Sequence, residues 1–279
     1  MINAIIFSKD RASQLRLFLY SIQKNAPHAF NLNVIYTSSN DEFKKGYEKV
    51  KDEFSSLCNF VDQTDNFKED VLNILNSESE FSCFFTDDDI IYKPFDVESV
   101  KNSIREDDDV FCFSLRLGTN VTFCYTMNTE NVLKNYEDLD ELIKWNWSVH
   151  YLDFGYPLSV DGHVFRTKDI LKLTRKVTFT NPNLFEGNLQ IFDTFPKEKM
   201  VSFKQNVLVN TPNNIVNSTH PNRHSADFGI GVKQLNDEYL SGSVIDLESM
   251  DFTDIKGCHQ ELEFKYKEEV KDLSTFSKK

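Results

Sequence analysis

Three consecutive carboxylates, Asp87, Asp88 and Asp89, follow an apolar run at residues 81–86. Adjacent carboxylates repel one another and destabilise a fold unless a cation or a set of donors compensates their charge. Hard oxygen ligands of this kind suit Mg²⁺ or Mn²⁺, especially where a diphosphate supplies further oxygens. In extended backbone Asp87 and Asp89 point the same way and Asp88 points the opposite way. We therefore expect Asp89 to ligate a metal ion with Asp87 nearby, and a solvated acidic turn is the alternative.

A second acidic triplet, at residues 107–109, precedes its apolar run instead of following it. In a parallel sheet it would lie at the edge opposite to residues 87–89, away from the edge where ligands collect. We interpret residues 107–109 as a solvated turn.

The elements that must position the acids are short apolar runs alternating with amphipathic helices. Strands are expected at residues 3–7, 32–36, 59–62 and 81–86, and helices between Asp10 and Pro27 and at 42–54 and 67–75. Asp10 and Asp65 are expected to cap the first and third of these helices. Such alternation predicts an α/β fold with a mainly parallel central sheet flanked by helices.

Four polar clusters follow these strands, at residues 8–11, 37–40, 62–66 and 87–89. Ligands of parallel sheets bind at the carboxyl ends of the strands. The four clusters are therefore expected to converge on one edge of the sheet and to form a site there.

The chain changes character from residue 110 onward. Strands are expected at 110–115, 121–127 and 156–166, the last interrupted by Gly162, whereas residues 139–147 are expected to be a short helix or loop. We expect a single domain over residues 1–250, with halves at 1–109 and 110–250. Residues 251–279 are expected to form a C-terminal helical tail, in which 261–279 is a charged amphipathic helix or a frayed end, and Cys258-His259-Gln260 near its start is a site candidate.

The composition excludes several classes of protein. The 279 residues carry 31 Lys+Arg against 44 Asp+Glu, a net charge of −13, which argues against nucleic acid or an anionic membrane surface as the main partner. With 40% hydrophobic residues, including 25 Phe, the chain is too apolar for a disordered acidic segment. No signal peptide or membrane span is expected. The five cysteines are odd in number and lack CxxC spacing, so we expect reduced thiols, no zinc site and a cytoplasmic protein.

Residues 8–15 after the first strand and residues 84–89 after the fourth resemble GT-A fold glycosyltransferases of the family-2-like group. In that group a DxD motif holds a divalent metal on a nucleotide-sugar diphosphate. Residues 156–166 are similar to the acceptor-side strand of the group, and the resemblance covers residues 1 to about 223. It implies that a sugar moves from a nucleotide-diphosphate sugar, UDP-linked by preference, to a glycan or other hydroxyl acceptor, with Mn²⁺ or Mg²⁺ as cofactor. Residues 1–109 would be the nucleotide-sugar half and 110–250 the acceptor half.

The resemblance also implies roles for single residues. Nucleotide-sugar binding would involve Ser8, Arg11, Ser38, Asn66, Lys68, Asp87, Asp88 and Arg223. For Arg11 the alternative is an exposed arginine in the first helical turn, and for Lys68 it is a solvated lysine. A third metal ligand would come from His220 or His224 in a polar loop, and a surface histidine is the alternative for each.

The chain departs from the family at the expected general base. Inverting members carry a Glu-Asp pair at the start of a helix, and here Glu186 is followed by Gly187. Glu186 could take the proton from an acceptor hydroxyl or have a structural role only, and Asp161 and Asp153 are further candidates. Inversion or retention therefore stays open.

Two other functions remain compatible with these features. A sugar nucleotidyltransferase has related topology but needs a Gly-rich loop after its first strand, and residues 8–14 contain no glycine. A nucleotide-sugar or glycan-binding protein without catalysis would share the fold, and Gly187 keeps this alternative open.

Overall fold

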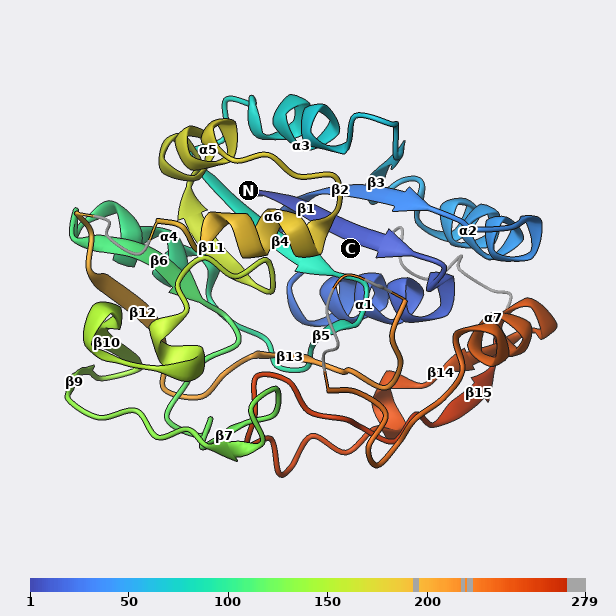
Figure 1. Ribbon diagram of the computed structural model, residues 1–279. Helices are drawn as coiled ribbons and strands as arrows, with labels where there is room; N and C mark the ends of the chain where they lie inside the picture. Colours follow the sequence, from blue (N-terminus) through green and yellow to red (C-terminus); the bar gives the residue numbers. More distant parts are fainter. Residues whose placement is uncertain (193–195, 217–218, 220–222, 270–279) are drawn as a thin grey trace.

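The computed structural model describes residues 1–192, 196–216, 219 and 223–269. The N-terminal part alternates strands and helices as predicted (Figure 1). Its elements are β1 (Ile2–Lys9), α1 (Ala12–Asn25), β2 (Phe30–Thr37), α2 (Asp41–Phe54), β3 (Cys58–Asp62), α3 (Phe67–Leu75) and β4 (Phe81–Thr86). The four strands pair in parallel in the order β3-β2-β1-β4, so their carboxyl ends share one edge of the sheet.

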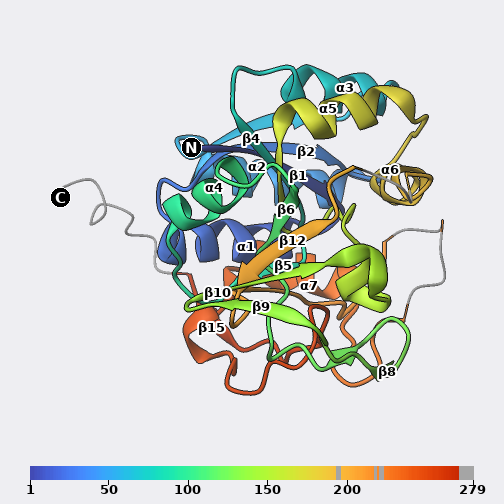
Figure 2. The same cartoon turned by 90° about the vertical axis from the view of Figure 1, so that its left-hand side faces the viewer.

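Helices cover both faces of this sheet (Figure 2). Along β1, Ala4 and Ile6 pack into the apolar cluster that contains residues of α1 and α2. Ile5 and Phe7 point to the other face and pack with residues of α3. A strand buried on both faces reads as a continuous apolar run, which is why β1 was visible in the sequence. The predicted α/β fold with a mainly parallel, helix-flanked sheet is confirmed.

The second half extends the sheet to nine strands in the order β3-β2-β1-β4-β11-β6-β12-β10-β9. Its elements are β5 (Asp89–Ile91), α4 (Val97–Arg105), β6 (Val110–Ser114), β7 (Phe123–Cys124), β8 (Thr129–Glu130), β9 (Tyr136–Leu139), β10 (Leu142–Asn146), η1 (Trp147–Val149), η2 (Leu152–Gly155), β11 (His163–Arg166), α5 (Thr167–Lys176), α6 (Pro182–Leu189), β12 (Lys199–Phe203), β13 (Leu208–Asn210), α7 (Val232–Ser241), β14 (Ser243–Ile245), η3 (Leu247–Ser249) and β15 (Tyr266–Glu268). Because β11 is antiparallel to both β4 and β6, this half of the sheet is mixed.

Three predicted elements are corrected. The stretch 139–147 is mostly strand: β10 pairs with β9 and β12, and Ile143 and Trp145 alternate inward with the period of two that a strand requires. The strand expected at 156–166 contracts to β11, because Gly162 adopts a φ of 69° just before it. The strand expected at 121–127 contracts to β7.

Neither predicted aspartate cap is present. Asp10 lies outside α1 with a φ of 58°, and its Oδ1 accepts the backbone N–H of Ser39 at 2.6 Å, so it ties the β1 end to the β2 end instead. α3 is capped by Asn66, whose side-chain oxygen accepts the N–H of Glu69 at 3.3 Å. The cap is thus one residue later than expected.

The predicted helical tail is also corrected for its described part. Over residues 251–269 the chain is loop and the strand β15, which pairs antiparallel with β14. Leu262 and Phe264 are buried in a cluster with Leu17 of α1 and Leu235 of α7, so the segment packs onto the body of the protein. The limits proposed for the domain and its halves remain predictions. Within the described ranges, every helix is too short or too polar to cross a bilayer.

Candidate functional site

Arg11 joins the ends of β1 and β4. Its NH1 lies 3.0 Å from Asp87 Oδ1 and 2.8 Å from Asp88 Oδ2, and its NH2 donates to the carbonyl of Asn214 at 2.7 Å. Ser8 Oγ donates to Asp87 Oδ2 at 2.8 Å. The predicted convergence of strand ends is therefore confirmed for these two strands, and Arg11 is buried instead of exposed.

The directions expected for the three aspartates are wrong. Asp87 and Asp88 both face Arg11, because the chain leaves extended geometry after Thr86 and turns at residues 87–88. Burial raises the pKa of Asp87 to about 6 in spite of Arg11. Burial, followed by the charges of Asp161 and Asp88, raises the pKa of Asp89 well above its usual range. The triplet is thus a buried cluster, not a solvated turn.

The side-chain amide of Asn210, at the end of β13, closes the cluster from the second half of the chain. Its Nδ2 lies 2.9 Å from Asp88 Oδ1, 3.2 Å from Asp89 Oδ1 and 3.0 Å from Thr86 Oγ1. β13 reaches this place because it pairs antiparallel with β5. Sequence reasoning missed Asn210, since only the strand pairing brings it to the acids.

Asp161 is the fourth carboxylate of the cluster. Its Oδ1 accepts from Thr86 Oγ1 at 3.1 Å, and its Oδ2 lies 3.2 Å from His259 Nε2 and 3.4 Å from Arg116 NH1. Burial favours the neutral acid, but the hydrogen bond and charge of His259, together with Arg116, lower the pKa of Asp161 to about 2. Asp161 is therefore ionised and fully engaged.

His259, in the tripeptide Cys258-His259-Gln260, is a further residue of the site, because its Nε2 contacts Asp161. It reaches the site through backbone pairing: the N–H of Asn210 donates to the carbonyl of Cys258, and the N–H of Gln260 donates to the carbonyl of Asn210, both at 2.9 Å. Arg116 was missed because an arginine in the middle of a chain gives no sign of being fully buried.

Glu186 lies on α6, which begins after the cap Asn181. Its Oε1 accepts from Ser159 Oγ at 2.9 Å and from the N–H of Val160 at 3.1 Å. Burial and the nearby charge of Asp161 raise the pKa of Glu186. These two candidate bases are thus close enough for the charge of Asp161 to act on Glu186.

The other predicted residues lie in varied surroundings. Ser38 is half-buried at the end of β2, and Asn66 caps α3. Lys68 is hydrogen-bonded through Nζ to the carbonyl of Arg175 at 3.1 Å. His224 Nδ1 lies 2.8 Å from Ser225 Oγ, and His220 lies outside the described residues. Their proposed parts in nucleotide or metal binding stay predictions.

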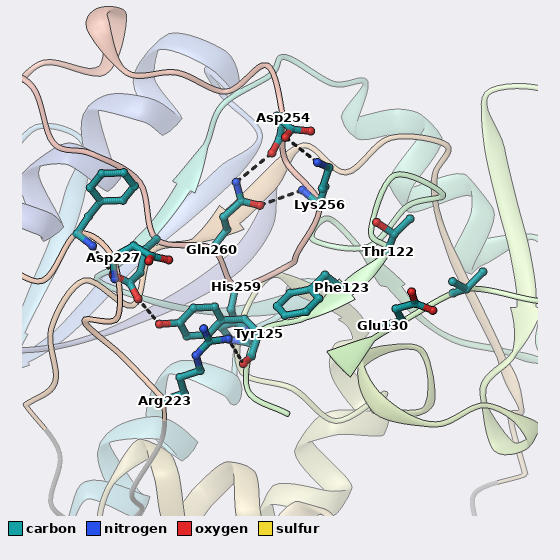
Figure 3. A pocket seen from close by; sticks show the side chains of 13 residues that line it. Thr122, Phe123, Tyr125, Glu130, Arg223, Asp227, Asp254, Lys256, His259 and Gln260 are labelled. Atoms are coloured by element: carbon teal, nitrogen blue, oxygen red, sulfur yellow. Dashed lines mark hydrogen bonds and ion pairs between the residues drawn. The ribbon is translucent and has the colours of Figure 1, made fainter. Parts of the chain in front are cut away.

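A pocket of about 640 Å³ has His259, the partner of Asp161, in its lining. Figure 3 shows the side chains that line it. Arg223 lines it, with its guanidinium 4.3 Å from the centre of the Tyr125 ring and NH1 2.7 Å from Asn128 Oδ1. His259 also lines it and reaches Asp161 with its Nε2, so one side chain belongs to both pocket and acid cluster. The remaining lining residues are Thr122, Phe123, Tyr125, Glu130, Val132, Asp227, Phe228, Asp254, Lys256, Gln260 and Glu261.

The chain is similar to proteins that transfer sugars. No family model matches it. It is 27% identical over 214 residues to the bifunctional glycosyltransferase pgtA of Dictyostelium discoideum. The matched stretch covers 67% of this chain and 28% of that protein. The chain therefore spans less than a third of the length of this curated relative.

Solved structures of similar fold include S. aureus TarS 1-349 in complex with UDP, with a TM-score of 0.46 and 14% identity, covering 76% of this chain and 61% of that one. Another is the mannosyltransferase PcManGT from Pyrobaculum calidifontis in complex with GDP-Man and Mn²⁺, with a TM-score of 0.41 and 10% identity, covering 74% and 56%. The predicted resemblance to glycosyltransferases is confirmed by the relative that matches two-thirds of this chain.

Proposed function

We propose that this protein is a glycosyltransferase that moves a sugar from a nucleotide-diphosphate sugar to a hydroxyl acceptor, such as a glycan, in the cytoplasm. The observation that carries the proposal is the 27% identity to a glycosyltransferase over 67% of the chain. The buried polar cluster at the strand ends supplies a suitable place for the chemistry, because ligands of parallel sheets bind at this edge. UDP is the preferred carrier on the resemblance of the strand-end motifs alone.

A divalent cation fits the acid cluster. Asp88 and Asp89 present hard oxygen donors, and after burial the charges of Asp161 and Asp88 contribute to the raised pKa of Asp89. Asp89 is the better of the two predicted ligands, because Asp87 is paired with the Arg11 cation, whereas Asp89 accepts from neutral donors, the N–H of Thr86 and Asn210 Nδ2. When bound, Mn²⁺ or Mg²⁺ would neutralise charge on the diphosphate leaving group. Asp87 then serves chiefly to hold Arg11 at the edge of the sheet.

Glu186 is the better candidate for the general base. A pKa of about 2 makes Asp161 a weak proton acceptor, and Arg116 and His259 already occupy it. The raised pKa of Glu186 brings it closer to the operating pH, which favours proton transfer. Ser159 and Val160 both hold Oε1, so they orient the carboxylate.

The test is isothermal titration with UDP and GDP, with and without Mn²⁺. We expect Mn²⁺-dependent binding of one nucleotide that weakens at least tenfold in Asp89→Ala. The matched control is Asp108→Ala in the second triplet, whose side chain is 95% exposed, and it should bind as the wild type does. If neither nucleotide binds, or binding ignores both Mn²⁺ and Asp89→Ala, the proposed donor and metal site are wrong.

The alternative of a non-catalytic binding protein rests on Gly187, which stands where the family carries an acid. Nucleotide binding alone does not separate the two functions. Slow release of free sugar from a bound donor would favour the enzyme. Tight donor binding without any turnover, in the presence of Mn²⁺, would favour the binding protein.

A further inference from the structure

We propose that Asp153, Cys258 and His259 form a binding site for a zinc-like transition-metal ion, separate from the acidic triplet. One ligand atom from each residue lies within 4.8 Å of the other two. The proposal does not depend on the glycosyltransferase function, because it concerns the metal alone.

The spacing of the nitrogen and sulfur atoms fits a metal bound between them. Cys258 Sγ lies 3.4 Å from His259 Nδ1. Zn–S bonds of about 2.3 Å and Zn–N bonds of about 2.0 Å at a tetrahedral angle place the two ligand atoms about 3.5 Å apart. The pair therefore needs almost no rearrangement to chelate one ion.

The histidine is already oriented for this role. Its Nε2 is held by Asp161 Oδ2 at 3.2 Å, which leaves Nδ1 as the nitrogen that faces the thiol. A carboxylate that holds the second ring nitrogen is the usual support of a metal-bound histidine. Asp153 is supported as well, since its Oδ2 accepts from Asn131 Nδ2 at 2.8 Å. Each of these two ligands thus has a partner that fixes its direction.

The chemistry of the donors selects the metal. Sulfur, imidazole nitrogen and carboxylate oxygen together favour Zn²⁺ over the hard ions Mg²⁺ and Mn²⁺. Three protein ligands leave a fourth tetrahedral position for water or another small ligand. His259 lines the pocket of Figure 3, which provides a path for the ion from solvent.

The spacing of the ligands in the sequence does not predict this site. The expectation of no zinc site rested on the absence of CxxC pairs, whereas here two ligands are adjacent in sequence and Asp153 comes from the distant η2. A different reading of the same atoms is a cysteine nucleophile activated by His259. Burial argues against it, because Cys258 is only 1% exposed and a substrate could not reach its sulfur.

The test uses the full chain, stripped with a chelator and then dialysed against Zn²⁺ or Co²⁺ without nucleotide. We expect one Zn²⁺ per chain by elemental analysis, and a thiolate-to-cobalt charge-transfer band with Co²⁺. Cys258→Ser should abolish the band, and Asp161→Asn should weaken Zn²⁺ binding by about 10- to 100-fold through loss of the support to His259. Cys58→Ser, in β3, and Asp89→Ala are the controls that should leave both signals unchanged.

A thermal melt of each metal-free variant confirms folding, and His259→Gln replaces Cys258→Ser if the latter fails to fold. Less than stoichiometric Zn²⁺, or a cobalt spectrum without thiolate character, overturns the proposal. Because Asp89→Ala abolishes only the proposed nucleotide-metal site, failure of one site is distinguishable from failure of the other.

Discussion

The Arg11 guanidinium lies 3.0 Å from the Asp87 carboxylate and thereby ties the carboxyl end of β1 to that of β4. Asp88 shares the same NH1 nitrogen, so one buried cation serves two buried carboxylates. Removing one partner of a buried pair leaves the other uncompensated, which is far more costly than losing a surface pair. Arg11 therefore stabilises the proposed donor site by pairing with both Asp87 and Asp88.

Arg11→Ala should therefore lower the free energy of unfolding by about 3–5 kcal/mol, measured by chemical denaturation without added metal. The control is Arg105→Ala, whose pair with Glu80 is exposed and should change the stability little. Equal effects of the two substitutions would contradict the buried pairing of Arg11.

Asn210→Asp tests whether the acid cluster accepts a cation. The substitution replaces an amide donor, which contacts Asp88 and Asp89, by another acid. We expect the melting temperature to fall by about 5 °C or more, equivalent to about 2 kcal/mol in a chain of this size. Added Mn²⁺ or Mg²⁺ should raise the melting temperature of the Asn210→Asp protein by more than it raises that of the wild type.

The control for this substitution is Asn73→Asp, at an exposed position of α3. It should show neither the loss nor the rescue. A destabilised Asn210→Asp protein that ignores both cations would argue against a divalent site at the triplet.

Glu186→Gln should lower sugar transfer, or donor hydrolysis, by about 10²- to 10⁴-fold while nucleotide affinity stays the same. Glutamine still accepts from Ser159 and Val160 but cannot take a proton. In the wild type the rate should rise with pH through a pKa above the ordinary value for glutamate, because burial and Asp161 raise the pKa of Glu186.

Glu106→Gln, at the exposed end of α4, is the matched control and should be as active as the wild type. An unchanged rate in Glu186→Gln would remove Glu186 as the base. A fall in nucleotide affinity equal to the fall in rate would instead indicate a structural role.

The parts of the site on β1 and β4 could be predicted because a parallel strand buried on both faces is a continuous apolar run, and the polar residues after it must lie at one sheet edge. Asn210 and His259 could not, since they meet through the pairing of β13 with β5 and a bridge between distant segments. The prediction of a short helix or loop at 139–147 is wrong, because the alternation of Ile143 and Trp145 spans only the five residues of β10, which is too short to identify a strand from sequence. In each case the placement depends on pairing between segments that are distant in the sequence, and local sequence patterns do not predict such pairing.

His163 provides a test of the core beside the site. It is fully buried, its Nδ1 lies 3.0 Å from the carbonyl of Pro157, and its Nε2 has no partner among the described residues. Because a carbonyl only accepts, Nδ1 carries the proton of a neutral ring. Burial and the charge of Arg116 lower the pKa of His163 to about 3.

The sign of the pH effect follows from proton binding in the two states. Between pH 6.5 and about pH 3 the unfolded chain binds a proton at His163 that the folded protein does not, so stability falls as the pH falls, by up to about 1.4 kcal/mol per pH unit. His163→Asn keeps a donor near the position of Nδ1 but does not titrate. The difference between the free energies of unfolding at pH 7 and pH 5, measured by chemical denaturation, should therefore be smaller in this variant than in the wild type. An unchanged difference would show that His163 is not held neutral.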